Sequence, residues 1–395
     1  MRRLAIVFAV LMLLLQPRPA NTSRGLIGLL GEATGPTPTP TSVPPAAASA
    51  SPTPPPLPTV TLATVFESHA PSLANLDKSK LITLITTGNV SAARTVNYEM
   101  AIRGDYTFPF RQTYTFTRAA DMTLADLESP LCPVIDATAT YCGDPQFVKG
   151  LELAGISVVS LPDYHIGGYG MDSITETETH LDAAHIVWAG FGTPAYEEVN
   201  NVIFGFVSFN GIGEDVDTTE MANEIRLAHK TAQVVVATFH WGKSDSSVPQ
   251  SDPGTANQDP RVLAHLAVDD GANLVIGNYP TWLQGVEIYH GVFISYASGN
   301  FVFDQTDTPE TSEGVVGTYT FYGTHLVSAR FRAVEIANFV QPHFVPARTE
   351  ISILARMKQA SMQIQAGYPD PSSQAAPTQT PSTAKPAAGT QAPSH

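Results

Sequence analysis

The chain alternates short apolar runs with longer amphipathic segments over most of its length. The apolar runs have the length of β-strands, and the longer segments have the length and polarity of helices. The expected strands cover residues 81–87, 121–127, 156–161, 185–190, 202–209, 233–242 and 272–277, and the expected helices cover residues 172–184, 219–231 and 260–270. Strands that alternate with helices predict an α/β layered fold.

The later part of the pattern differs, because strands follow one another without helices between them. Residues 286–289, 292–297, 325–332 and 333–339 are each expected to form a strand. Such a run predicts an antiparallel extension of the sheet and therefore mixed pairing. The expected architecture is a layered α/β sandwich in which mixed β-sheets are flanked by helices.

The two ends of the chain differ in composition from this body. Arg2 and Arg3 precede an apolar run, residues 4–15, that would reach roughly 18 Å as a helix, short of a bilayer core of ~30 Å. Residues 1–20 therefore predict a secretory signal peptide or an uncleaved N-terminal anchor, and either places the body outside the cytoplasm. Residues 21–60 are expected to be a Pro/Thr/Ala-rich linker, residues 61–367 the folded domain, and residues 368–395 a disordered tail.

Composition and charge exclude some partners. The formal net charge is -15 at pH 7, the sequence pI is about 5.1, and no basic block interrupts this acidity. Nucleic acid is therefore excluded as a partner, and simple electrostatic docking on anionic lipid or an anionic polymer is disfavoured. The 43% hydrophobic content is ample for a large core.

The two cysteines of the chain are Cys132 and Cys142. In an exported protein they are expected to form a disulfide, with two free buried thiols as the alternative. The spacing does not match a metal-binding CxxC motif.

Polar residues gather where the expected strands end. Asn89, Asp126 with Glu128, Asp163 with His165, His240, and Asn278 each follow one of five strands in turn. Loops at the carboxyl ends of such strands are where α/β proteins build their sites. Carboxylates and imidazoles that converge from several loops predict a divalent metal site.

The chain resembles the CapA family, the capsule and poly-γ-glutamate synthesis proteins with a calcineurin-like metallophosphoesterase fold. The resemblance runs in order over about 225 residues, through "ITTGNVSAAR", "YTFPF", "ADMTLADLESPL", the segment around "SLPDYHIGGYG", "VVVATFHWG" and "LVIGNYPTWLQGVEIYHGVFISYASGNFVFDQ". The last segment is the most specific, because its frame is nearly unbroken. The resemblance implies a metallophosphoesterase-like sandwich and a role in cell-surface polymer production.

The departures from the family pattern fall on the positions that the resemblance implies as metal ligands. Asn89 replaces the aspartate that would bridge two metals, and Tyr164 replaces an amide ligand. Asn278 and Thr281 replace two histidines of the last loop, and Tyr279 replaces the histidine between them. The degenerate ligand positions are therefore Asn89, Tyr164, Asn278 and Thr281. Because two neighbouring cations need an anionic bridge, a conventional two-metal site is not expected.

Two interpretations of the remaining ligands stay open. Glu128, His165 and His240, with Asp126 or Asp163, could hold a single divalent metal (Mn, Zn or Mg), because three protein ligands suffice for a catalytic metal. His165 or His240 would then be the catalytic acid. Alternatively, these residues are hydrogen-bonded remnants in a retained scaffold that holds no cofactor.

Three functions are compatible with this pattern. The first is a non-catalytic or weakly catalytic extracytoplasmic protein that binds a cell-surface polymer or membrane polymer-synthase subunits, for which Trp241, Tyr279 and Trp282 could provide an aromatic platform. The default for each tryptophan is core packing. The second is a metal-dependent phosphoesterase or polymer hydrolase with a reduced metal site. The third is a stalked adhesion module, which the Pro-rich segments fit equally well.

Overall fold

A computed structural model of the chain describes residues 56–67, 72–132, 141–161 and 169–367. These residues belong to one unit, Pro56–His395. The expected signal or anchor at residues 1–20, the linker up to residue 55 and the tail at 368–395 lie outside the described residues, and so do Asp163, Tyr164 and His165. No helix in the described ranges is both long and apolar enough to span a membrane.

The first β-sheet has eight strands and is built around β1. Its order is β14-β13-β12-β1-β2-β3-β4, and β11 pairs separately with β1. Strands β1 to β4 and β11 pair in parallel, whereas β12, β13 and β14 extend the sheet in antiparallel fashion. The strands are β1 (Leu81–Val90), β2 (Met122–Leu127), β3 (Val158–Ser160), β4 (Val187–Ala189), β11 (Asn300–Val302), β12 (Glu313–Tyr322), β13 (His325–Ala337) and β14 (Gln341–Phe344).

The second sheet has six strands in the order β5-β6-β7-β8-β10-β9. Its centre is parallel, and the edge strands β5 and β9 pair in antiparallel fashion. Its strands are β5 (Ala195–Val199), β6 (Val202–Asn210), β7 (Val234–His240), β8 (Leu274–Asn278), β9 (Val286–Tyr289) and β10 (Val292–Ser295). Both sheets are mixed, which confirms the predicted fold class.

The two sheets pack face to face through a shared apolar core. Side chains alternate between the two faces of a strand, so on β7 Val234 and Val236 enter this core while Val235 faces the other way. Phe204 of β6 meets Phe321 of β12 edge-on across the gap, with ring centroids 5.2 Å apart. These contacts hold the inner faces together at the end of the sandwich where the parallel strands β1, β2, β6 and β7 begin.

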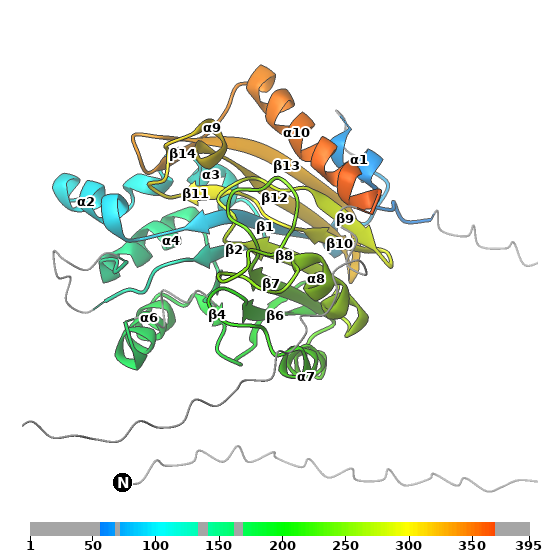
Figure 1. Ribbon diagram of the computed structural model, residues 1–395. Coiled ribbons are helices and arrows are strands. Elements are labelled where there is room, and N and C mark those ends of the chain that lie inside the picture. Colours follow the sequence, from blue (N-terminus) through cyan, green and yellow to red (C-terminus); the bar gives the residue numbers. More distant parts are fainter. Residues whose placement is uncertain (1–55, 68–71, 133–140, 162–168, 368–395) are drawn as a thin grey trace, which may run out of the picture. The chain divides into compact units, whose positions relative to one another are not determined.

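Helices cover the outer faces of both sheets (Figure 1). The first sheet is covered by α2 (Arg94–Arg103), α4 (Val148–Ala154) and α6 (Met171–Ala183), and the second by α7 (Thr218–Ala228) and α8 (Pro260–Asp269). The long C-terminal helix α10 (Ala347–Gln365) packs on β9, β13 and the short helix α1 (Leu62–Phe66). The other short helices in the described ranges are η1 (Lys78–Lys80), η2 (Phe108–Phe110), α3 (Tyr114–Thr117), η3 (Pro145–Phe147) and α9 (Pro309–Ser312).

The starts of α7 and α8 follow from their capping residues. The Asp217 side chain accepts hydrogen bonds from the backbone N–H groups of Thr219 and Glu220 at the start of α7. Asp259 accepts from the Arg261 N–H in the same way, and Pro260 stands in the first turn of α8, where its missing N–H costs nothing. These caps position the two helices that close the outer face of the second sheet.

The structure corrects the sequence prediction in its last third. The two strands expected at residues 325–332 and 333–339 are one strand, β13, which pairs continuously with β12. Its inward alternation of Ala329, Phe331 and Ala333 runs through the expected break without a turn residue. Strands β5, β11, β12 and β14 and helices α2, α4 and α10 were not predicted.

A buried ion-pair network ties α8 to β9. Glu287 accepts hydrogen bonds from Arg261 Nη2 at 2.7 Å and from the Tyr296 hydroxyl at 2.6 Å, and its Oε2 lies 3.1 Å from His265 Nε2. Burial by itself would raise the pKa of Glu287. The hydrogen bonds from His265, Arg261 and Tyr296 outweigh burial and lower this pKa from 4.5 to about 2.

This shift predicts a pH-dependent contribution to stability. Because the pKa of Glu287 is lower in the folded chain than in the unfolded chain, its contribution is full above pH 4.5 and is lost as the pH falls toward 2. Over that interval the wild-type free energy of unfolding should fall by about 3 kcal/mol more than that of Glu287→Gln. Urea unfolding at a series of pH values gives the slope of the free energy of unfolding against pH for the wild type and for Glu287→Gln. The exposed control Glu335→Gln should follow the wild type, and equal slopes for wild type and Glu287→Gln would contradict the prediction.

Candidate functional site

The side chains in the gap between the sheets change from apolar to polar toward the carboxyl ends of the central strands. The change follows the period-two alternation of the inner face, so each strand contributes at every second residue. The inward series are Val234, Val236, Thr238 and His240 on β7, Phe204, Phe206 and Ser208 on β6, and Met122, Leu124 and Asp126 on β2. The site therefore lies inside the sandwich, where the apolar core ends.

A ring of three buried hydroxyl groups marks the border between the apolar and polar layers. Ser160 Oγ lies 2.6 Å from Ser208 Oγ and 2.9 Å from Thr238 Oγ1, and the last two atoms are 2.5 Å apart. Each hydroxyl can donate one hydrogen bond and accept another, so the ring satisfies its own polar atoms. It separates the apolar core from the charged groups beyond it.

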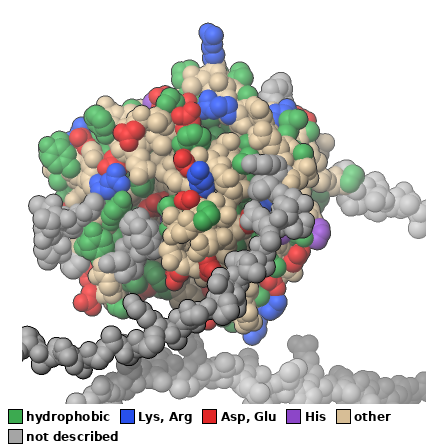
Figure 2. All heavy atoms as spheres, in the orientation of Figure 1, with side chains coloured by type: hydrophobic (Ala, Val, Ile, Leu, Met, Phe, Trp, Pro, Cys, Tyr) green, Lys and Arg blue, Asp and Glu red, His purple; other side chains and the backbone are tan. Residues whose placement is uncertain are grey.

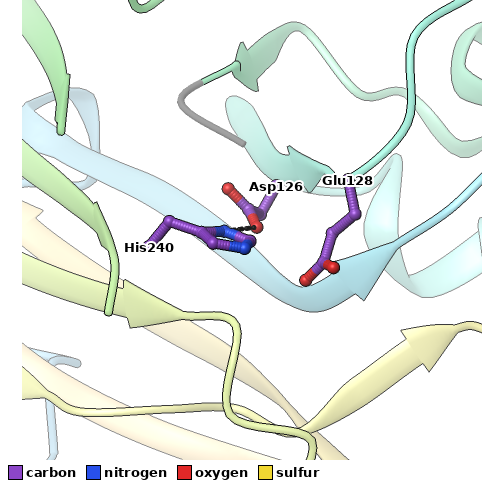
Figure 3. Close-up of side chains that lie close together, drawn as sticks. All are labelled: Asp126, Glu128 and His240. Carbon is purple, nitrogen blue, oxygen red and sulfur yellow. Dashed lines mark ion pairs between the residues drawn. The ribbon is translucent and has the colours of Figure 1, made fainter. Parts of the chain in front are cut away.

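Three ionisable side chains converge directly beyond this ring. Asp126 and Glu128 come from the end of β2 and His240 from the end of β7, and ligand atoms of all three lie within 4.8 Å of one another (Figure 3). His240 Nδ1 is 3.3 Å from Asp126 Oδ2, and both side chains are fully buried. The backbone N–H of Glu128 donates to the Val90 carbonyl at 2.8 Å, which fixes Glu128 beside β1.

This cluster has a donor set that fits one divalent cation. Two carboxylates and an imidazole suit Mn, Zn or Mg to different degrees, and three protein ligands leave an open position. Two carboxylates this close and this buried also need a compensating positive charge. A protonated His240 or a bound divalent cation would each supply it. Asp163 and His165, the other expected ligands, lie outside the described residues.

Asn89, at the expected bridging position, is bound at both ends of its amide. Its Oδ1 accepts from the Tyr279 N–H at 3.1 Å, and its Nδ2 donates to the Tyr279 carbonyl and to Asn300 Oδ1, each at 3.1 Å. Tyr279 has φ = 82°, in the left-handed region that non-glycine residues rarely adopt. The side chain of Asn89 thus holds a strained backbone, and an aspartate could not make the two donated bonds.

In the loop that follows β8, Asn278 and Thr281 place an amide and a hydroxyl group near the site. Asn278 is buried and pairs in register with His240, and its Oδ1 has no hydrogen-bond partner among the described residues. The Thr281 hydroxyl lies 3.1 Å from Ser244 Oγ and 3.3 Å from the Ser244 carbonyl. The Tyr279 ring lies beside that of His240, with centroids 5.0 Å apart.

The two tryptophans that could provide a platform occupy different environments. Trp241 is 1% exposed, stacks on Phe239 with ring centroids 4.4 Å apart, and donates its indole N–H to the Tyr296 carbonyl. This is core packing, and it leaves no exposed face of Trp241 for a polymer. Trp282 is only partly buried, and its backbone N–H donates to the Ser244 carbonyl.

An acidic cavity of about 570 Å³ adjoins the polar layer on the side of β6 and α7. Ser208 and Asn210 contribute to its wall, together with Glu220 and Glu224 of α7. Burial, and then the charge of Glu220, raise the pKa of Glu224 to about 7. Nothing in the sequence distinguishes these glutamates, because residues 219–231 have the pattern of an ordinary amphipathic helix.

Cys132 and Cys142 form a disulfide, which confirms the expected pairing. Their Cα atoms are 5.7 Å apart, and the backbone N–H of Cys132 also donates to the Gly143 carbonyl. The bridge closes the loop that follows Glu128 and so braces the end of β2.

On the face of the molecule shown in Figure 2, Lys and Arg side chains are dispersed among Asp and Glu side chains.

The fold and the site together define an α/β/β/α sandwich with a buried acidic and imidazole cluster at its strand ends. A family model described as bacterial capsule synthesis protein PGA_cap matches residues 83–305, and the chain belongs to this family. This assignment confirms the resemblance to CapA proteins.

Individual relatives match over part of their length. The chain is 28% identical over 222 residues to the PGA biosynthesis protein CapA of Bacillus subtilis (strain 168), covering 50% of this chain and 57% of the relative. It is 23% identical over 261 residues to the capsule biosynthesis protein CapA of Bacillus anthracis, covering 58% of this chain and 61% of the relative. The chain therefore spans less than two thirds of the length of these curated relatives.

Similarity to solved structures is weaker. A hypothetical protein from Thermus thermophilus aligns with a TM-score of 0.43 at 14% identity, over 65% of this chain and 100% of that one. The calcineurin-like phosphoesterase YfkN from Bacillus subtilis aligns with a TM-score of 0.34 at 10% identity, over 72% of this chain and 98% of that one. TM-scores this low do not support an argument about function.

The contacts of Asn89 predict that an aspartate is not tolerated at this position. Asn89→Asp removes both donated hydrogen bonds and adds a buried negative charge beside Asp126, its neighbour in register on β2. The free energy of unfolding should fall by about 2–3 kcal/mol. Chemical denaturation with and without Mn measures this loss. The exposed control Asn223→Asp should be near neutral, and full recovery of Asn89→Asp on addition of Mn would contradict the prediction.

Proposed function

We propose that this protein serves the production of a cell-surface polymer outside the cytoplasm. It binds the polymer or a membrane synthase subunit, and it has no two-metal catalytic centre. The observation that carries the proposal is the Asn89 amide, whose oxygen and nitrogen both bond to the backbone of Tyr279. Membership of the capsule synthesis family supports the process, and the names of the two CapA relatives give PGA and capsule as the products of those proteins.

Electrostatic repulsion disfavours a two-metal centre in this chain. Two cations about 3.5–4 Å apart repel each other strongly and need a shared anionic ligand. Asn89 is neutral, and each polar atom of its amide is already used. Thr281, which stands where the resemblance implies a histidine ligand, is hydrogen-bonded to Ser244. A second cation would therefore have no anionic ligand to share with the first and no imidazole ligand from the loop that carries Thr281.

The extracytoplasmic location rests on the apolar run that follows Arg2 and Arg3 and on the Cys132–Cys142 disulfide. If the N-terminal segment stays uncleaved, it would tether the domain to the outer face of the membrane. Digestion of intact cells with an external protease tests the location. Protection of the folded domain in cells with a sealed cytoplasmic membrane would contradict it.

The proposal predicts at most one metal per chain. The whole chain, purified without chelator, should contain less than two equivalents of Mn, Zn or Mg by inductively coupled plasma mass spectrometry. Among the described residues, Asp126, Glu128 and His240 form the one group in which three ligand atoms from carboxylates or imidazoles lie within 4.8 Å of one another. Any stoichiometric metal should be lost in Glu128→Ala/His240→Ala and kept in the exposed control Glu335→Ala/His290→Ala. Two equivalents that survive in the control would contradict the proposal.

A second candidate is a hydrolase with one metal, and the convergence of Asp126, Glu128 and His240 favours it. A divalent cation at this cluster would supply Lewis-acid chemistry for the hydrolysis of a phosphoester or a polymer linkage. The chain itself would contribute Asp126, which holds the His240 ring in place at 3.3 Å, and a dry environment that strengthens every charge interaction. His240 Nδ1 faces Asp126, so only Nε2 is left for chemistry. If the carboxylates of Asp126 and Glu128 alone held the cation, Nε2 would transfer a proton to the leaving group; if Nε2 bound the cation, it could not.

The hydrolase candidate predicts that His240 is required for activity. With Mn present, the wild type should hydrolyse bis-p-nitrophenyl phosphate, and His240→Ala should lower the rate by at least about 100-fold, as expected for loss of an acid–base group. His290→Ala, at an exposed histidine, is the matched control, and thermal unfolding verifies that each variant is folded. Equal rates for wild type and His240→Ala would eliminate this candidate.

A further inference from the structure

A second cavity, of about 260 Å³, lies between the C-terminal half of α10 and the loop that follows β8. Trp282 and Ser247 contribute to one wall, and Gln359 and Gln363 of α10 to the other. Two glutamates, Glu310 of α9 and Glu313 at the start of β12, also line it. The cavity is slightly smaller than the roughly 300–1,000 Å³ of sites for drug-sized molecules, so it suits one monosaccharide-sized unit.

The lining has the chemistry that recognises a pyranose ring. A pyranose presents an apolar C–H face and a rim of hydroxyl groups, and the partly buried indole of Trp282 offers an apolar ring with a polar N–H. Gln359 and Gln363 are four residues apart, so they project from the same side of α10. Each amide can donate and accept, as a hydroxyl group requires of its partner. Both glutamines are exposed, and no hydrogen bond within the described chain engages their side chains.

The charges around the cavity select against an anionic ligand. Arg356 is the only basic group in the described lining, and it is paired with Glu313. Glu310 leaves the lining with a net negative charge, and the whole chain carries -15. A phosphate group or a run of glutamates would therefore be repelled, whereas a neutral sugar would not.

The cavity and the buried cluster share one loop. Asn278 begins this loop beside His240, Thr281 is tied to Ser244, and Trp282 donates its backbone N–H to the same Ser244 carbonyl. The backbone that carries the indole is therefore held in a fixed place. The backbone on this side of the cavity therefore needs no ordering when a ligand binds.

We propose that the cavity lined by Trp282, Gln359 and Gln363 binds one neutral pyranose unit of a surface saccharide. The inference rests on the proposed role in polymer production and adds the chemical class of the polymer. It is independent of the metal content of the Asp126, Glu128 and His240 cluster, so the two can fail separately.

The experiment uses the three tryptophans of the chain, Trp188, Trp241 and Trp282, as reporters. In the ¹⁵N-labelled whole chain their indole N–H groups give three resonances, which single Trp→Phe variants assign. Titration with neutral maltohexaose, cellohexaose and chitohexaose should shift the Trp282 resonance with at least one of them. Binding by the variants is followed in the backbone amide resonances that shift with the sugar in the wild type. Trp282→Ala and Gln363→Ala should each weaken that binding about tenfold, as loss of a stacked ring or a paired hydrogen bond would, while Trp188→Phe should bind like the wild type.

Three results would overturn the proposal. The first is that none of the three oligosaccharides shifts the Trp282 resonance at millimolar concentration. The second is that a hexamer of γ-linked glutamate shifts it and the sugars do not, which would assign the cavity to an anionic peptide. The third is that saccharide binding survives unchanged in both Trp282→Ala and Gln363→Ala, which would place the sugar elsewhere and leave the polymer-binding function intact.

Discussion

The pairing of the Asn89 amide with the backbone of Tyr279 is the constraint on which the site depends. Asn89 lies at the end of β1 in the first sheet, and Tyr279 follows β8 in the second, so this pair joins the two sheets at their polar end. A third bond, to Asn300, ties in the strand β11 beside β1. The apolar core holds the sheets together from one end, and this amide cross-link holds them together from the other. The carboxylates and the imidazole between them are kept in place as a result.

The same constraint limits the chemistry of the site. A side chain that must donate two hydrogen bonds cannot also carry the negative charge that bridges two cations. What remains is a buried cluster in which Asp126 contacts His240 and Glu128 lies close by. The loop held by Asn89 runs on to Trp282, so the positions of the buried cluster and of the cavity beside Trp282 are set together.

The sequence predicted the layered α/β fold and the convergence of Asp126 with His240, because both follow from apolar alternation and from the parallel direction of the central strands. It could not predict the partners of Asn89, since Tyr279 and Asn300 are 190 and 211 residues away and nothing local encodes such contacts. Core packing, the default expectation for Trp241, is what its 1% exposure and its stacking on Phe239 show. Helix α10 did have a local signal, the spacing of its buried residues Ile353, Met357, Ala360 and Ile364, which was overlooked.

Anomalous diffraction from crystals grown with millimolar Mn, recorded at the Mn absorption edge, tests the central claim most directly. It locates each cation and does not depend on any assumed substrate. The account predicts either no peak in the sandwich or a single peak bounded by Asp126, Glu128 and His240, with the Asn89 amide still bonded to Tyr279. Two peaks about 3.5–4 Å apart with Asn89 between them would contradict it.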